Sequence, residues 1–135
     1  MTWEQTIGVH SGAAPHDIWL ALVTPRRWRD WNDGVEWVAL EGPLAPGSFV
    51  TVKPRPGRQT AFRIDSVVEE RLLAASVTLG PLAALTATFV LAEENGGCSI
   101  GLTIGVRGPL GGLMRKRAER IAATMAARLE RLASG

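Results

Sequence analysis

The segment from Val35 to Arg107 most constrains the fold, because it reads as an uninterrupted series of short strands and turns. It contains six runs rich in valine, threonine, isoleucine and leucine, each separated from the next by a cluster of turn residues. Consecutive antiparallel strands joined by short connections pair with one another, so the segment predicts a β-meander. We place its strands at residues 35–41, 48–54, 59–69, 72–79, 83–93 and 98–107.

The N-terminal segment adds one strand and two short helices. Residues 2–10, TWEQTIGVH, alternate apolar and polar side chains, which is the period of a half-buried strand. Pro15 suits the first turn of a helix, and Thr24 ends that helix because a residue before proline avoids the α region. Thr24 is also a suitable N-cap, so a second short helix is predicted at 25–32.

One face of such a sheet needs a cover, and the last segment supplies it as a helix at 110–133. Its polar face is predicted to hold Arg115, Lys116, Glu119, Arg120, Arg128, Glu130 and Arg131. Its apolar stripe is Leu110, Leu113, Met114, Ile121, Met125, Leu129 and Leu132. The predicted fold class is therefore α+β, a curved seven-stranded antiparallel sheet with two short helices and a long C-terminal helix over its concave face.

Length, cysteine content and charge limit the class of protein. The 135 residues fit one domain, 1–135, and the single cysteine, Cys98, excludes an internal disulfide. No signal peptide and no long apolar run are present, which predicts a soluble cytoplasmic protein without stable membrane insertion. The net charge of +2 is a weak argument for a polyanionic partner.

The order of these elements resembles the helix-grip fold of the START-like, or polyketide cyclase/dehydrase (SRPBCC), superfamily. The segments that carry the resemblance are APHDIWLALVTPRRWRDWNDGVEWV, LEGPLAPGSFVTVKP, FRIDSVVEERLL, FVLAEENGGCSI and GPLGGLMRKRAER. The resemblance implies an apolar cavity between sheet and long helix that binds lipids, sterols, polyketides or other hydrophobic molecules. A minority of the superfamily are enzymes, so it implies a cavity more firmly than a reaction.

Strand alternation assigns the faces of three strands and leaves two open. Strand 48–54 could turn inward either Phe49 and Thr51 or Val50 and Val52, and strand 72–79 is equally ambiguous. Where the phase is clear, no Asp, Glu, His or Cys points inward, which offers little for acid–base chemistry. The inner sets are Phe62, Ile64 and Ser66; Leu85, Ala87, Phe89 and Leu91; and Ile100, Leu102, Ile104 and Val106.

The predicted ligand-binding residues combine these inner sets with residues on the helices. Trp28 and Trp31 lie three apart on one helix face, where they either belong to the core or line the cavity. Reading of nucleic acid is disfavoured, because Asp30 and Asp33 dilute the neighbouring arginines. The full set is Trp28, Trp31, Phe62, Ile64, Ser66, Phe89, Leu102, Ile104, Leu113, Met114, Arg117, Ile121 and Met125.

Arg117 interrupts the apolar stripe of the long helix. Either its methylene stem packs while the guanidinium reaches water, or the guanidinium anchors a ligand carboxylate or enolate. His10, His16 and Cys98 show no metal-ligand spacing, and the glycine pairs match no phosphate loop, so neither metal nor cofactor is predicted.

The predicted function is binding of a small hydrophobic molecule. The alternative is a polyketide cyclase or dehydratase in the same cavity, with Arg117 stabilising an enolate and Ser66, Thr51 or Ser76 orienting it. A partner-binding module is a third possibility. A homodimer is compatible with the sequence, and no nucleic-acid partner is expected.

Overall fold

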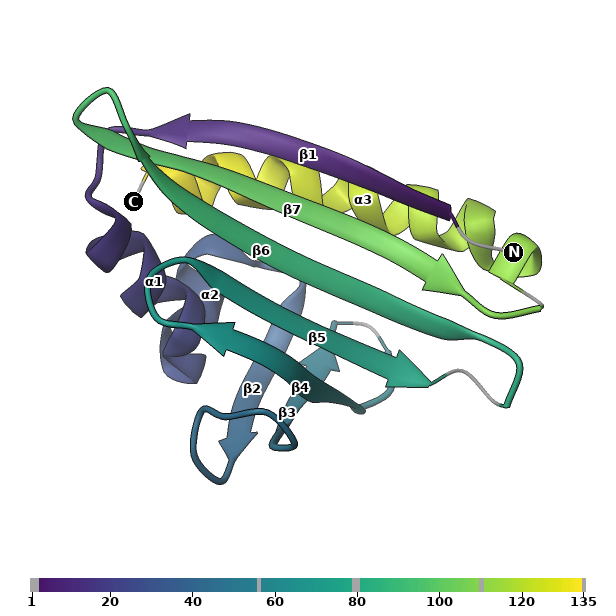
Figure 1. Cartoon of the computed structure of the whole chain (residues 1–135). Coiled ribbons are helices and arrows are strands. Elements are labelled where there is room, and N and C mark those ends of the chain that lie inside the picture. Colours follow the sequence, from purple (N-terminus) through teal and green to yellow (C-terminus); the bar gives the residue numbers. More distant parts are fainter. Residues whose placement is uncertain (1–2, 56, 79–80, 110, 135) are drawn as a thin grey trace.

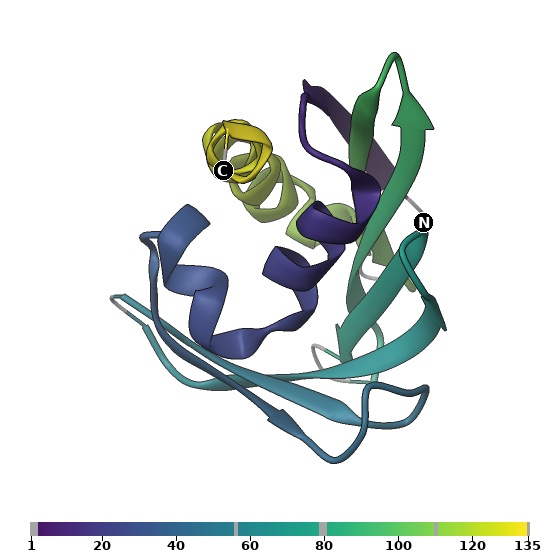
Figure 2. The ribbon, with the colours of Figure 1, turned by 90° about the vertical axis from the view of Figure 1, so that its left-hand side faces the viewer.

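The structure, a computed structural model, describes residues 3–55, 57–78, 81–109 and 111–134, without the side chains of 111–113. The strands are β1 (Trp3–Ser11), β2 (Val35–Glu41), β3 (Phe49–Pro54), β4 (Thr60–Val68), β5 (Leu72–Thr78), β6 (Ala84–Glu94) and β7 (Gly97–Arg107). The helices are α1 (Pro15–Val23), the 3-10 turn η1 (Pro25–Arg27), α2 (Trp28–Trp31) and α3 (Gly111–Ser134). The strands form one antiparallel sheet that curves around the helices, as Figures 1 and 2 show.

The sheet order is β1-β7-β6-β5-β4-β3-β2, which confirms the predicted meander and the predicted fold class. β1 joins the sheet by pairing with β7, from Trp3 opposite Val106 to Ser11 opposite Cys98. The predicted second helix is a 3-10 turn followed by one α-turn, and the Thr24 side chain makes no capping hydrogen bond. Residues 2, 79 and 110 of the predicted elements lie outside the described residues.

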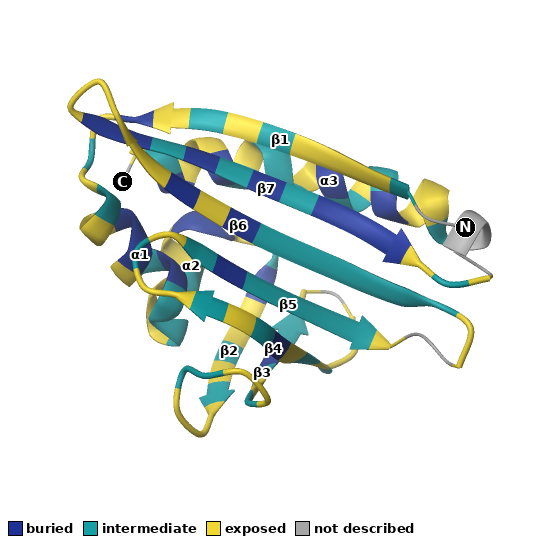
Figure 3. Ribbon diagram, viewed as in Figure 1, coloured by how far each residue is buried: buried dark blue, intermediate teal, exposed yellow. Residues whose placement is uncertain are grey.

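Helix α3 packs against one half of the concave face. Its main strand contacts are with β1 and β7, and Figure 3 shows buried positions along α3. Ala118 and Ala122 are among the buried residues of this helix. Alanine has a short side chain, so these positions let the helix backbone approach the sheet closely. The Ser11 hydroxyl donates a hydrogen bond of 2.6 Å to the Ala133 carbonyl and ties the C-terminal end of α3 to β1.

The other half of the concave face has less helical cover. Helix α1 contacts β6 and β7, while α2 contacts β2 and α3. The inner sides of β3, β4 and β5 therefore curve around a space that α3 borders but does not fill. Within the described part of the chain, no helix is both long and apolar enough to cross a membrane.

A β-bulge in β4 corrects the predicted orientation of Ser66. The pairing of β4 with β5 shifts between Ile64, opposite Ala75, and Ser66, opposite Ala74. A bulge inserts one residue and so reverses the alternation of side chains beyond it. Ser66 is consequently exposed, and the next apolar residue that packs toward the core is Val67.

We predict that Ala122 cannot accept a larger side chain, because it is 0% exposed between α3 and the sheet. Ala122→Leu should lower the free energy of unfolding by about 1–3 kcal/mol through overpacking. Ala127→Leu is the matched control, since Ala127 is exposed on the same helix and leucine is a good helix former. Urea unfolding followed by circular dichroism measures both, and equal stability of the two variants would contradict the close packing.

Candidate ligand-binding cavity

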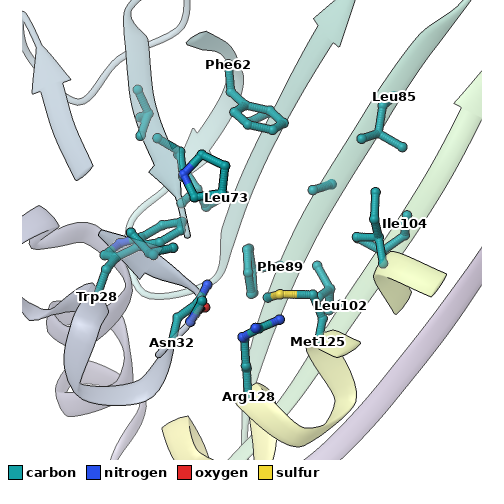
Figure 4. Close-up of a pocket in the computed structure, with 18 of the residues that line it drawn as sticks. Trp28, Asn32, Phe62, Leu73, Leu85, Phe89, Leu102, Ile104, Met125 and Arg128 are labelled. Atoms are coloured by element: carbon teal, nitrogen blue, oxygen red, sulfur yellow. Dashed lines mark hydrogen bonds between the residues drawn. The ribbon is translucent and has the colours of Figure 1, made fainter. Parts of the chain in front are cut away.

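A cavity of about 430 Å³ lies between the concave face of the sheet and α3, with α2 at one end (Figure 4). Its wall is predominantly apolar, and none of the described residues that line it is Asp, Glu, His or Cys. Arg55, whose side chain is exposed, marks where the cavity meets solvent. The apolar wall includes Trp28, Val50, Val52, Phe62, Ile64, Leu73, Ala75, Leu85, Ala87, Phe89, Leu102, Ile104, Ile121 and Met125.

The structure brings most of the predicted site residues to this cavity. They come from three strands and two helices that are distant in sequence, and the curvature of the sheet gathers them around one space. Their contact with a ligand remains a prediction. The predicted residues in the wall are Trp28, Phe62, Ile64, Phe89, Leu102, Ile104, Ile121 and Met125.

Four predicted residues lie elsewhere. Ser66 is exposed beyond the bulge, and Trp31 is a core residue behind the wall. Met114 and Arg117 line an adjoining groove of about 270 Å³, which shares with the main cavity the residues Val52, Pro54, Phe62, Leu85 and Ile121. Arg117 is exposed there, and the side chain of Leu113 lies outside the described part of the structure.

The strands of ambiguous phase turn valine and small residues inward. Val50 and Val52 of β3 line the cavity, whereas Phe49 is 43% exposed on the other side. On β5 the inward residues are Leu73 and Ala75. Pairing decides this phase, because residues opposite each other share a face: Val50 lies opposite Phe62 of β4.

The two tryptophans of α2 have different roles. Trp31 is 3% exposed, with its ring centroid 5.0 Å from that of Trp28 and 6.5 Å from that of Phe89. Both indole N–H groups donate to backbone carbonyls of α1, from Trp28 to Leu22 at 2.8 Å and from Trp31 to Ala21 at 3.2 Å. Trp28 is therefore held with its ring as part of the cavity wall, and Trp31 supports it from the core.

Arg128 lines the cavity, although we expected it on the polar face of the helix. Eleven residues make about three turns of an α-helix, so Arg128 lies on nearly the same stripe as Arg117 and Met114. The spacing of eleven residues from Arg117 is the feature of the sequence that could have placed Arg128 at the cavity. The two arginines differ in burial because the loop after α2 packs over Arg128, whereas Arg117 is exposed.

Two polar side chains of the cavity wall, those of Asn32 and Arg128, lie at one end. Asn32, which ends α2, is 6% exposed, and its side-chain oxygen accepts a hydrogen bond from the Gly34 N–H at 3.2 Å. Gly34 packs on the Arg128 guanidinium so closely that a Cβ there would lie 2.9 Å from Cζ. Figure 4 shows Asn32 and Arg128 at the same end as Trp28, and Phe62 and Leu85 at the other.

The hydroxyl groups considered for catalysis do not reach the cavity. Thr51 is buried, but it alternates with Val50 and Val52 and so faces the other side of β3. Ser76 follows Ala75, which lines the cavity, so the side chain of Ser76 points to the opposite face of β5. Ser66 is exposed. Among the described residues, no cluster of three or more His, Cys, Asp or Glu side chains could hold a metal ion.

A curved antiparallel sheet gripping a C-terminal helix around an apolar cavity defines the helix-grip class. Residues 2–134 match the family described as polyketide cyclase / dehydrase and lipid transport, and the chain belongs to that family. No curated protein matches the chain significantly.

Solved structures share the fold at low sequence identity. Protein MLL2253 from Mesorhizobium loti has a TM-score of 0.75 and 15% identity, with 96% of this chain and 93% of that chain covered. Norcoclaurine synthase from Thalictrum flavum has a TM-score of 0.73 and 16% identity, covering 98% and 92%. DynU16, from the dynemicin biosynthetic locus, has a TM-score of 0.71 and 20% identity, covering 96% of this chain and 45% of that chain.

We predict that Cys98 is unreactive in the folded protein. The residue is 0% exposed, and burial raises the pKa of its thiol, an effect that a backbone hydrogen bond at Ala92 partly offsets. Since the thiolate is the reactive form, modification by DTNB at neutral pH should be roughly a hundred-fold or more slower in native than in urea-unfolded protein. Equal rates in the two states would show that the reagent reaches Cys98 in the folded protein, so that the core between β1 and β7 is accessible to solvent there.

Proposed function

We propose that this protein binds a small hydrophobic molecule in the cavity between the sheet and α3. The cavity itself carries the proposal: about 430 Å³ of space lined mainly by apolar side chains. Small-molecule sites typically measure about 300–1,000 Å³ and combine an apolar wall with a few polar groups. The family description, which includes lipid transport, supports the same function.

The space is unlike a packing defect. Protein interiors are close-packed and contain few voids larger than a water molecule. Here the inner positions of β5 and β6 include Ala75 and Ala87, which lie opposite each other in the sheet and keep the middle of the cavity open. Larger side chains at these two positions would fill the space, so the sequence maintains the cavity through small residues.

The composition of the wall favours binding over acid–base catalysis. A cyclase or dehydratase needs a titratable group within reach of the substrate. The described lining residues include no carboxylate, imidazole or thiol, and the three candidate hydroxyl groups lie outside the cavity. The polar side chains at its end, Asn32 and Arg128, are suited to hold and orient a ligand, and a cyclase acting here would have to rely on them.

Binding can be tested with N-phenyl-1-naphthylamine, a neutral probe whose emission rises in apolar surroundings. Saturable binding to the native protein is expected, with energy transfer from tryptophan because Trp28 lines the cavity. Trp28→Phe should reduce that transfer more than Trp37→Phe, since Trp37 is 39% exposed and does not line the cavity. Absence of saturable binding would count against the proposal.

Filling the cavity should abolish probe binding without unfolding the protein. Ala87→Phe directs a ring into the empty space, so we expect roughly a ten-fold or larger loss of probe affinity with cooperative unfolding preserved. Ala92→Phe is the matched control, because Ala92 lies on the same strand but is exposed. Fluorescence titration and urea unfolding measure both variants, and unchanged affinity in Ala87→Phe would place the probe elsewhere.

A further inference from the structure

The guanidinium of Arg128 is incompletely paired at the wall of the cavity. Its Nε is buried, and no described residue accepts a hydrogen bond from it. The nearest carboxylate oxygen, Oδ1 of Asp33, is 3.7 Å away, which is an ion-pair distance too long for a hydrogen bond. A buried charged donor without an acceptor is costly, so this group is poised to bind one.

Asp33 does not neutralise the arginine pair beside the cavity. Its second oxygen, Oδ2, accepts from Nη1 of Arg131 at 3.1 Å, so one carboxylate faces two guanidinium groups. The Asp33 side chain is 68% exposed, so water screens its charge. The Arg128 side chain is only 20% exposed. Arg128, Arg131 and Asp33 together carry one net positive charge. Of the two guanidinium groups, that of Arg128 is less exposed to water, and it lies at the cavity.

A second hydrogen-bond donor lies at the same end. The side-chain oxygen of Asn32 is engaged by the Gly34 N–H, which directs its amide nitrogen away from that turn. No described residue pairs with this nitrogen, although Asn32 is buried in the cavity wall. The indole N–H of Trp28, by contrast, is already used by the Leu22 carbonyl. The unengaged donors shielded from water at this end are thus those of Asn32 and Arg128, because Arg55, which also lines the cavity, is exposed.

We propose that the natural ligand is an amphipathic organic acid, whose carboxylate binds Arg128 and Asn32 while its apolar part fills the cavity toward Phe62 and Leu85. The proposal rests on the proposed binding function and adds the class and orientation of the ligand. Donors at one end and apolar side chains at the other match such a molecule in Figure 4. A carboxylate accepts the two parallel hydrogen bonds that a guanidinium offers, which a neutral ester does not reproduce.

The competing anchor is Arg117, which is exposed at the adjoining groove beside Met114. A guanidinium in water gains little from an ion pair, because solvent screens the charge and the side chain loses freedom. Arg128 is more restricted, since Gly34 packs on its head group and Asp33 holds one side. The acid is therefore expected at the Arg128 end of the cavity.

The test is displacement of N-phenyl-1-naphthylamine at neutral pH by two matched pairs, lauric acid with methyl laurate and 2-naphthoic acid with methyl 2-naphthoate. Probe binding alone reports the proposed function. The ratio of acid to ester affinity reports the anchor, and the pair with the larger ratio shows whether a chain or a fused ring fits better. The proteins compared are the wild type, Arg128→Met, Arg128→Lys, Arg117→Met and the control Arg115→Met, which removes one exposed charge from the same helix and borders no described cavity.

In the wild type and Arg115→Met, at least one acid should bind roughly ten-fold or more tightly than its ester. Arg128→Met should bring that ratio close to one while leaving the affinity for the ester and the probe within about three-fold, because methionine keeps the stem's packing. Arg128→Lys should retain part of the preference, since it keeps a charge without the planar pair of donors. Urea unfolding checks that each variant remains folded.

Two results would overturn the proposal while leaving the binding function intact. One is saturable probe binding with no preference for either acid in the wild type. The other is loss of the preference in Arg117→Met with retention in Arg128→Met, which would put the anchor at the opposite end. If Arg128→Met fails to fold, Gly34→Ala replaces it, because the added Cβ displaces the guanidinium without removing its charge and should lower the acid-to-ester ratio alone.

Discussion

The close packing of α3 on β1 and β7 is the constraint from which the rest of the structure follows. Ala118 and Ala122 are buried at this contact, and the Ser11 hydroxyl fastens the far end of the helix through the Ala133 carbonyl. Because the helix packs against one half of a curved sheet, the other half encloses a cavity that no helix side chains fill. The cavity is a consequence of where the helix lies.

The tryptophans of α2 close one end of that space. Trp31 packs in the core between Trp28 and Phe89, and both indole N–H groups bind carbonyls of α1, so the short helix is held by packing as well as by its own hydrogen bonds. A helix of this length would not be stable alone. Its rigidity places the following residues, Asn32 and Gly34, at the cavity, where they become the polar end of an otherwise apolar wall.

The distribution of charge connects the fold to the proposed function. The description of the family covers both cyclases or dehydrases and lipid transport, so the groups at the site, and not the fold, decide the function. Here the described wall lacks carboxylate, imidazole and thiol groups, while a half-buried guanidinium lies at one end. Such a wall can recognise an acidic amphiphile by burial at one end and hydrogen bonding at the other, without transferring a proton.

Local patterns were sufficient to predict the strand order from β2 to β7, the long amphipathic helix and the inward face of β7, because alternation and turn residues act over a few positions. Tertiary structure decided the rest. Pairing with β4 selected Val50 over Phe49, and a bulge turned Ser66 to solvent. Arg117 and Arg128 share a helical stripe, yet the loop at Gly34 covers Arg128 and leaves Arg117 in water. Periodicity specifies the direction in which a side chain points from the axis of its helix or strand. Its burial depends on which distant segment packs against it.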